Sequence, residues 1–263
     1  MERERRLIFG EDAELYDRSR PAYPDPLVAD LIALAGLTDG RGALEVGAGT
    51  GKATAMFAAR GVPVLAIEPS AEMAAVARRN CAGYPGVEIV EADFERWRPD
   101  GREFALVYAA QSWHWIAPEV RFQRARAALP AGGLLAAFWT RPRWDRSELR
   151  DELTAVYRDY GPELERDGPM HPATNLPFDE YQDWSAAIQA AGGFDKSEVR
   201  RYDWTQTYSA AGFAELSGTL SEILLMEPGL RRQLLEDIRG VIDAAGGTFT
   251  MSYVTLLYLA WAV

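Results

Sequence analysis

The first 140 residues alternate between short apolar runs and stretches with the periodicity of helices. An uninterrupted apolar run is typical of a strand that is buried on both faces of a parallel sheet. Strands that alternate with helical stretches predict a doubly wound α/β sheet whose strands are mostly parallel. The runs occupy residues 43–46, 62–67, 87–94, 104–110 and 134–139, with helical stretches at 52–60, from Ser70 onward and at 118–129.

The rest of the chain contains longer helical stretches and only two segments that look like strands. The predicted helical stretches are 145–160, 179–191 and 210–245, the last with a break at Glu-Pro-Gly 227–229, and the predicted strands are 196–208 and 248–263. Valine and aromatic residues alternate with polar residues in the first of these strands, which suits the edge of an antiparallel region.

The first apolar run leads directly into three alternating glycines, Gly47, Gly49 and Gly51. Glycine reaches backbone angles that other residues avoid, and it presents no Cβ to a ligand. A strand that ends in such a turn and continues into a helix offers bare backbone beside a helix start. The turn therefore predicts a site for a nucleotide-like molecule.

Spacing separates the ligands that bind glycine-rich turns. A phosphate-binding P-loop is excluded, because Val46 and Ala53 stand where that motif needs a glycine and a Ser or Thr. A dinucleotide turn is disfavoured, because Lys52 occupies the slot of its third glycine. The pattern that remains is E-x-G-x-G-x-G, which begins at Glu45.

Acidic residues follow the next two apolar runs. Glu68 lies 23 positions after Glu45, close to the spacing at which a carboxylate meets a ribose in βαβ nucleotide folds. Met73 is placed to rest its thioether on an adenine ring, and Asp93 with Phe94 suits the amino group and the ring of adenine. Two plainer interpretations stay open: Glu68 as a solvated carboxylate at a strand end, and Asp93 as the cap of a turn.

In this order, the motifs resemble the class I S-adenosylmethionine (SAM) dependent methyltransferases. The E-x-G-x-G-x-G turn is similar to motif I of that family. The segments Ser-Trp-His-Trp at 112–115 and Leu-Pro-x-Gly-Gly at 129–133 are similar to the region after the family's fourth strand. The resemblance covers roughly residues 40–140, and the order of the motifs is more specific than any one of them.

The resemblance implies one domain with a seven-stranded, mostly parallel, Rossmann-like sheet whose last strand is reversed. Residues 1–140 would form the SAM-binding core with an N-terminal helix, and the two late strands would be the sixth and seventh. Helices inserted at about 141–195 and 209–247 would form a cap over the SAM site, where substrate specificity usually resides in this family.

The resemblance also implies that SAM is bound at the glycine turn and that S-adenosylhomocysteine (SAH) is released. The residues that it assigns to the cofactor in this part of the chain are Glu45, Gly47, Ala48, Gly49, Gly51, Glu68, Pro69, Met73, Asp93, Phe94 and Gln111.

Residues 9–24 are similar to the leader helix of small-molecule methyltransferases of this class, in which a Tyr and an Arg reach the methionine carboxylate of SAM. Tyr16 and Arg20 are four positions apart and therefore share a face of a helix. A guanidinium group is suited to binding a carboxylate. The alternative is that Arg20 pairs with a nearby acid such as Asp17 or Glu14.

His114 is the candidate catalytic base, because it directly follows the fourth strand and the ordinary pKa of histidine suits proton removal near neutrality. The alternative is a wall residue that packs, with Trp113, against the cofactor. Trp113 and His171 are the candidate substrate contacts, and the plainer interpretation of His171 is a surface histidine. With two histidines and one cysteine, we expect no dedicated metal site, although carboxylates could hold Mg²⁺.

Composition narrows the classes of partner. The net charge of −11 argues against a nucleic-acid substrate, because phosphate backbones require clustered Lys and Arg. The single cysteine excludes an internal disulfide, and neither a signal peptide nor an apolar run of transmembrane length is evident. We therefore expect a cytoplasmic enzyme, monomeric or homodimeric, that contacts neither membrane nor nucleic acid.

The sequence thus predicts a SAM-dependent methyltransferase that acts on a small molecule, with secondary metabolites and organic acids as the acceptor classes considered. The identity of the acceptor and the methylated atom stay open. The alternative from another class is a non-methylating enzyme, such as a cyclase or decarboxylase, on the same SAM-binding fold. A partner-binding protein with a vestigial SAM site is disfavoured, because such a pocket has no need of the whole glycine and acidic series.

Overall fold

The computed structural model describes residues 12–37, 41–161 and 184–263, and its centre is one seven-stranded sheet of order β3-β2-β1-β4-β5-β7-β6. The first five strands are parallel, whereas β7 runs antiparallel to both β5 and β6. The predicted fold class, a mostly parallel sheet with a reversed last strand, is confirmed. The strands are β1 Ala43–Val46, β2 Val64–Glu68, β3 Val87–Glu91, β4 Leu106–Ala110, β5 Leu134–Pro142, β6 Phe194–Ser209 and β7 Thr248–Ala262.

Helices cover both faces of the sheet. Helices α3 and α4 pack on one face against side chains such as Tyr108 and Phe138, and α6 and α9 pack on the other against Val107 and Trp139. Successive residues of each buried strand point to opposite faces, which explains why the strand sequences are apolar throughout. The helices described are α2 Ala13–Ser19, α3 Asp25–Ala35, α4 Lys52–Ala58, α5 Ala71–Asn80, α6 Arg121–Ala127, α7 Arg150–Asp159, α9 Trp184–Ala191, α10 Ala210–Gly218, α11 Ser221–Leu224 and α12 Pro228–Ala244.

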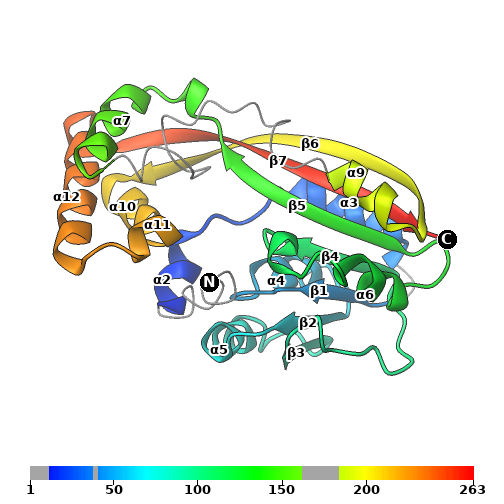
Figure 1. The fold of residues 1–263 in the computed structure, drawn as a ribbon. Coiled ribbons are helices and arrows are strands. Elements are labelled where there is room, and N and C mark those ends of the chain that lie inside the picture. Colours follow the sequence, from blue (N-terminus) through cyan, green and yellow to red (C-terminus); the bar gives the residue numbers. More distant parts are fainter. Residues whose placement is uncertain (1–11, 38–40, 162–183) are drawn as a thin grey trace.

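Strands β6 and β7 form a long antiparallel ribbon that extends past the parallel strands (Figure 1). Helices α7, α10, α11 and α12 gather at one end of this ribbon and enclose a second hydrophobic core around Phe213, Leu234 and Tyr253. These helices come from both predicted insertions. Helix α9 also comes from the first insertion, but it packs on the main sheet, because Trp184 and Ile188 join the core beside α6.

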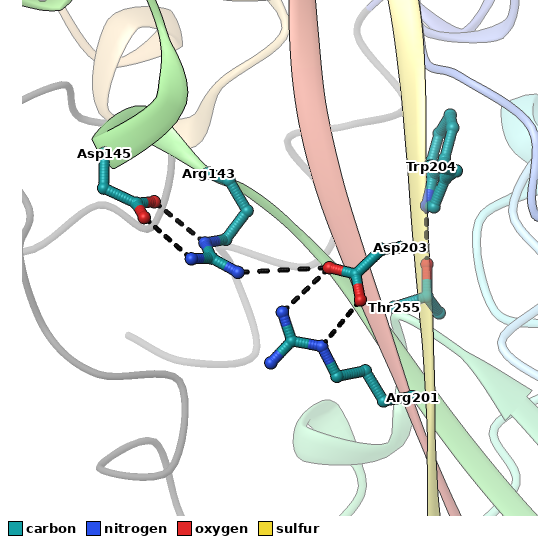
Figure 2. Close-up of polar contacts among 6 residues, drawn as sticks. All are labelled: Arg143, Asp145, Arg201, Asp203, Trp204 and Thr255. Carbon is teal, nitrogen blue, oxygen red and sulfur yellow. Dashed lines mark hydrogen bonds and ion pairs between the residues drawn. The ribbon is translucent and has the colours of Figure 1, made fainter.

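A network of polar contacts links the residues that follow β5 to strand β6 of the ribbon (Figure 2). Arg143 makes two hydrogen bonds to Asp145 and lies 3.9 Å from Asp203, which also pairs with Arg201. Each exposed ion pair contributes only about 0–1 kcal/mol to stability. Beside this network, the indole nitrogen of Trp204 donates to Oγ1 of the buried Thr255 at 2.9 Å. The contacts fix the end of β5 relative to the ribbon that carries the cap helices.

Candidate functional site

A cavity of about 390 Å³ lies where β1, β2, β4 and β5 end, and helix α2 and the α10–α11 turn close it from the cap side. The crevice beyond the carboxyl ends of the strands is where open α/β sheets bind ligands. Several groups on its wall were not anticipated from sequence, among them Tyr23, Thr140, Arg141 and Leu220. The predicted site residues that line the cavity are Tyr16, Arg20, Glu45, Gly47, Ala48, Gly49, Glu68, Pro69, Met73, Phe94, Gln111 and His114.

The three glycines of the turn have different physical roles. All have positive φ angles, of 71° at Gly47, 58° at Gly49 and 80° at Gly51. A Cβ on Gly47 would lie 2.6 Å from Cβ of Ser112, and one on Gly51 would lie 3.2 Å from Ala77, whereas a Cβ on Gly49 would meet nothing within 4 Å. Packing therefore requires glycine at the two outer positions, while the middle one leaves open space on the cavity wall.

Replacing Gly47 with alanine should destabilise the protein more than the same change at Gly49. Both variants force alanine into a left-handed backbone, which costs about 1–2 kcal/mol, but only Gly47→Ala adds the collision with Ser112. In thermal unfolding without ligand, we expect Tm to fall by roughly 5 °C or more for Gly47→Ala and by roughly half as much for Gly49→Ala. Equal losses would contradict the division of roles.

Glu68 closes β2 and faces the glycine turn. One carboxylate oxygen accepts the backbone N–H of Gly49 at 2.7 Å, and the other accepts that of Ser70 at 2.9 Å. Only 7% of the residue is exposed, so the interpretation as a solvated carboxylate does not describe it. A carboxylate oxygen can accept more than one hydrogen bond, so Glu68 is suited to accept from two neighbouring hydroxyl groups on a ligand.

Of the two predicted site residues after β3, Phe94 lines the cavity wall and Asp93 starts a turn. Phe94 is 2% exposed and lines the cavity, and Met73 reaches it from the first turn of α5. Asp93 does not line the cavity. Its carbonyl accepts the N–H groups of Arg96 and Trp97, which places it at the start of a turn. The contact of the Asp93 side chain with adenine therefore stays a prediction.

Glu45 is a buried carboxyl group at the floor of the cavity. It accepts hydrogen bonds from Oγ1 of Thr54 and from the hydroxyl of Tyr108, and so connects β1 to α4 and β4. Burial raises the pKa of Glu45 to about 7, and nearby Glu68 adds to the rise, against the lowering effect of the two hydroxyl donors. Although it lines the cavity, its hydrogen bonds link neighbouring elements of the fold.

The raised pKa of Glu45 predicts how stability depends on pH. The folded protein holds the Glu45 proton more tightly than the unfolded chain, so the free energy of unfolding should fall as pH rises from about 4.5 to about 7. The contribution is about 3 kcal/mol. Glu45→Gln should flatten this fall, as shown by Tm values measured across that window. A variant with the slope of the wild type would contradict the assignment.

Arg20 connects the N-terminal helix to the cap. Its Nε donates to Oγ1 of Thr219 at 2.8 Å, and Nη2 donates to the carbonyl of the same residue at 2.9 Å. Asp17 instead lies 3.6 Å from Lys52, and Glu14 pairs with Arg79, so the acids suggested as alternative partners are used elsewhere. Nη1 of Arg20 makes no hydrogen bond to the described part of the chain, which leaves two N–H groups for a ligand carboxylate.

His114 lies in a short 3₁₀ helix, Trp113–Trp115, and its side chain is exposed to the cavity. Its Nδ1 accepts the indole N–H of Trp139 at 3.1 Å. The protein atoms around the ring, together with the charges of Arg141 and Arg121, lower the pKa of His114 to about 4. The imidazole is therefore neutral at physiological pH.

Trp113 and Gly51 do not line the cavity. Trp113 is 1% exposed and packs in the core between Phe94 and Phe122. Gly51 caps α4 behind the turn. His171 lies outside the described residues. Within the described ranges, no group of three or more acidic, histidine or cysteine side chains could hold a metal ion, and no helix is long and apolar enough to cross a membrane.

Known methyltransferases are similar to this chain in sequence. A family model described as a methyltransferase domain matches residues 43–133. An uncharacterized methyltransferase of Mycobacterium tuberculosis is 27% identical over 260 residues, which cover 97% of this chain and 95% of that protein. The chain is a class I SAM-dependent methyltransferase.

The methyltransferase has further relatives and structural neighbours. The trans-aconitate 2-methyltransferase of Delftia acidovorans is 34% identical over 188 residues, which cover 70% of this chain and 66% of that protein. A candidate type II methyltransferase of Anaeromyxobacter dehalogenans shares the fold with a TM-score of 0.62 at 22% identity, over 92% of this chain and 97% of that one. Phosphoethanolamine N-methyltransferase 2 of Haemonchus contortus, solved with SAH, has a TM-score of 0.53 at 15% identity, over 97% of this chain and 56% of that one.

Proposed function

We propose that this methyltransferase transfers the methyl group of SAM to a small-molecule acceptor inside the cavity. The observation that carries the proposal is that one cavity is lined by two chemically different halves. The first half, at the ends of β1 and β2, contains the glycine turn and Glu68, and the second, at the ends of β4 and β5, contains His114 and Arg141. A cavity of about 390 Å³ is of the size that small-molecule sites have.

The residues of the first half fit SAM. Gly49 offers backbone with open space in front of it, the Glu68 carboxylate faces the turn and is suited to accept from ribose hydroxyls, and Nη1 of Arg20 can donate to the methionine carboxylate. When bound, SAM supplies an electrophilic methyl group on a sulfonium. The protein's own part is to hold and orient the two molecules and to exclude water.

The acceptor belongs in the second half of the cavity, beside His114 and Arg141. Relatives named as trans-aconitate 2-methyltransferases support organic acids as one acceptor class, and secondary metabolites remain the other. The net charge of −11 disfavours a nucleic acid as substrate. The only cysteine, Cys81, is buried and free, which suits the reducing cytoplasm.

Mass spectrometry tests the proposed reaction. Purified protein is incubated with SAM carrying a labelled methyl group and with pools of small metabolites. We expect a labelled product that is heavier than its precursor by one CH₂ group, about 14 Da plus the extra mass of the label, together with an equal amount of SAH. Products of altered structure without the label or SAH would instead identify a non-methylating enzyme such as a cyclase or decarboxylase.

A further inference from the structure

We propose that the methyl acceptor is a carboxylate group that is already ionised at neutral pH, and that Arg141 and the Nε2–H group of His114 recognise it. This inference rests on the proposed function and adds the chemical class of the acceptor. It is carried by the hydrogen bond that fixes the His114 ring and by the charges around that ring.

The hydrogen bond from Trp139 decides which nitrogen of His114 carries the proton. An indole N–H can only donate, so Nδ1 of His114, which lies 3.1 Å from it, must be unprotonated. In the neutral imidazole the proton is then on Nε2. The low pKa of His114 keeps the ring neutral, so this form is the one present at physiological pH.

In this state His114 is a hydrogen-bond donor rather than a base. Nδ1 is occupied by the indole of Trp139, and Nε2 already holds its proton. Gaining a second proton is further opposed by the protein atoms around the ring and by the positive charges of Arg141 and Arg121. A hydroxyl acceptor would need a base to remove its proton, whereas a carboxylate needs none.

The charges that act on the His114 ring are positive, those of Arg141 and Arg121. Arg141 comes from β5 and lines the cavity beside His114. The acidic residues on the wall come from other elements: Glu45 and Glu68 from β1 and β2, and Glu222 from α11 of the cap. A negatively charged group on the acceptor is therefore matched to the His114 end, and a cationic amine is opposed there.

A second arginine adds a charge that the described residues do not neutralise by a direct contact. Arg121 is only 5% exposed, its Nε has no hydrogen-bond partner, and it makes no ion pair with a described residue, although the charge of Glu119 acts on it. Its guanidinium lies 4.5 Å from the centre of the Trp184 ring, which stacks on Trp139 at 4.8 Å.

A buried cation without an anionic partner costs free energy, and a bound anion nearby offsets part of that cost. Arg121 does not line the cavity, so we assign it an electrostatic and positioning role behind His114 and not a contact. The stack of Arg121, Trp184 and Trp139 also holds the indole that fixes the His114 ring.

The transfer balances without a base. The bond between a carboxylate oxygen and the methyl carbon forms while the bond between methyl carbon and sulfur breaks, and the electron pair of the broken bond stays on sulfur. The carboxylate and the sulfonium each lose their charge, no proton is released, and the products are a methyl ester and SAH.

Calorimetry on protein saturated with SAH tests acceptor recognition apart from turnover. The probes are aliphatic di- and tricarboxylic acids of four to six carbons, each compared with its primary amide. We expect at least one acid to bind and its amide to bind about tenfold to a hundredfold more weakly, the range that a lost charge-assisted hydrogen bond implies. Arg141→Gln should weaken binding of that acid by a similar factor and leave the Kd of SAH within about twofold.

The matched control is Arg143→Gln. Arg143 lies two positions after Arg141, just past the end of β5, and it pairs with Asp145 and does not line the cavity. The Arg143→Gln variant should therefore bind the acid with a Kd within about twofold of the wild type. Arg121→Gln, which acts only at a distance, should weaken acid binding less than Arg141→Gln does.

Two further readouts separate a donor from a base at His114. His114→Gln keeps a side-chain N–H donor and should lower kcat by less than about tenfold, whereas His114→Leu should lower it by more. Treatment of the product with alkali should return the starting acid, as expected of a methyl ester. Failure of SAH to bind the wild type would overturn the proposed function itself. Bound SAH with an alkali-stable methylated product, or with amides that bind as well as acids, would overturn only the carboxylate proposal.

Discussion

Gly49→Arg should abolish binding of SAM and SAH to a protein that remains folded. The structure leaves open space in front of Gly49, so the added side chain projects into the cavity instead of colliding with the fold. It would then occupy the volume that the cofactor requires beside the turn. By titration calorimetry, we expect micromolar-range affinity for SAH in the wild type and at least about a hundredfold loss in the variant, since steric exclusion removes most of the binding free energy.

Gly61→Arg is the matched control for this experiment. Gly61 also has a positive φ, of 79°, and open space around its missing Cβ, but it follows α4 and does not line the cavity. The two variants therefore introduce the same side chain with comparable backbone strain. Binding of SAH to Gly49→Arg at the wild-type Kd would show that the cofactor is held elsewhere.

Glu68→Gln should weaken SAH binding by about a hundredfold, which corresponds to two hydrogen bonds to a charged acceptor. The carboxylate oxygens accept from Gly49 and Ser70 and can accept in addition from two ribose hydroxyls. An amide in the same position has one acceptor oxygen, and its NH₂ group faces a backbone donor. The substitution should therefore disturb the backbone geometry of the turn and also weaken the hydrogen bonds to the ribose.

A double-mutant cycle separates these two effects. The loss caused by Glu68→Gln should be smaller for a 2′,3′-dideoxy analogue of SAH than for SAH, because the analogue lacks the hydroxyls. Glu91→Gln is the control, since Glu91 is the exposed partner of Glu68 in the register of β2 and β3. Equal losses for SAH and its analogue would mean that Glu68 supports the turn without contacting the ribose.

The parallel half of the sheet could be predicted because its strands are buried on both faces. Such strands must be apolar throughout, so β1, β2, β4 and β5 stand out as uninterrupted runs. The ends of the helices were harder to predict from the sequence. The helical stretch expected over 210–245 has its predicted break at 227–229, where Pro228 starts α12, but the turn at Thr219 that separates α10 from α11 was not predicted.

The glycine turn and Glu68 could be found in the sequence because backbone geometry restricts which residues can stand there. Nothing comparable marks Arg141, which lines the cavity only because β5 extends past the parallel strands to pair with β7. The contact of Arg20 with Thr219 depends on two segments almost 200 positions apart. The inward packing of Trp113 depends on the 3₁₀ helix that turns it toward Phe122.

A crystal structure of the complex with SAH would show directly whether the cofactor lies in this cavity. We predict that the ribose hydroxyls lie within hydrogen-bond distance of the Glu68 carboxylate, that the adenosine contacts the backbone at Gly49, and that the sulfur faces the end of the cavity lined by His114 and Arg141. SAH bound outside this cavity, or with its sulfur turned away from His114 and Arg141, would contradict this prediction.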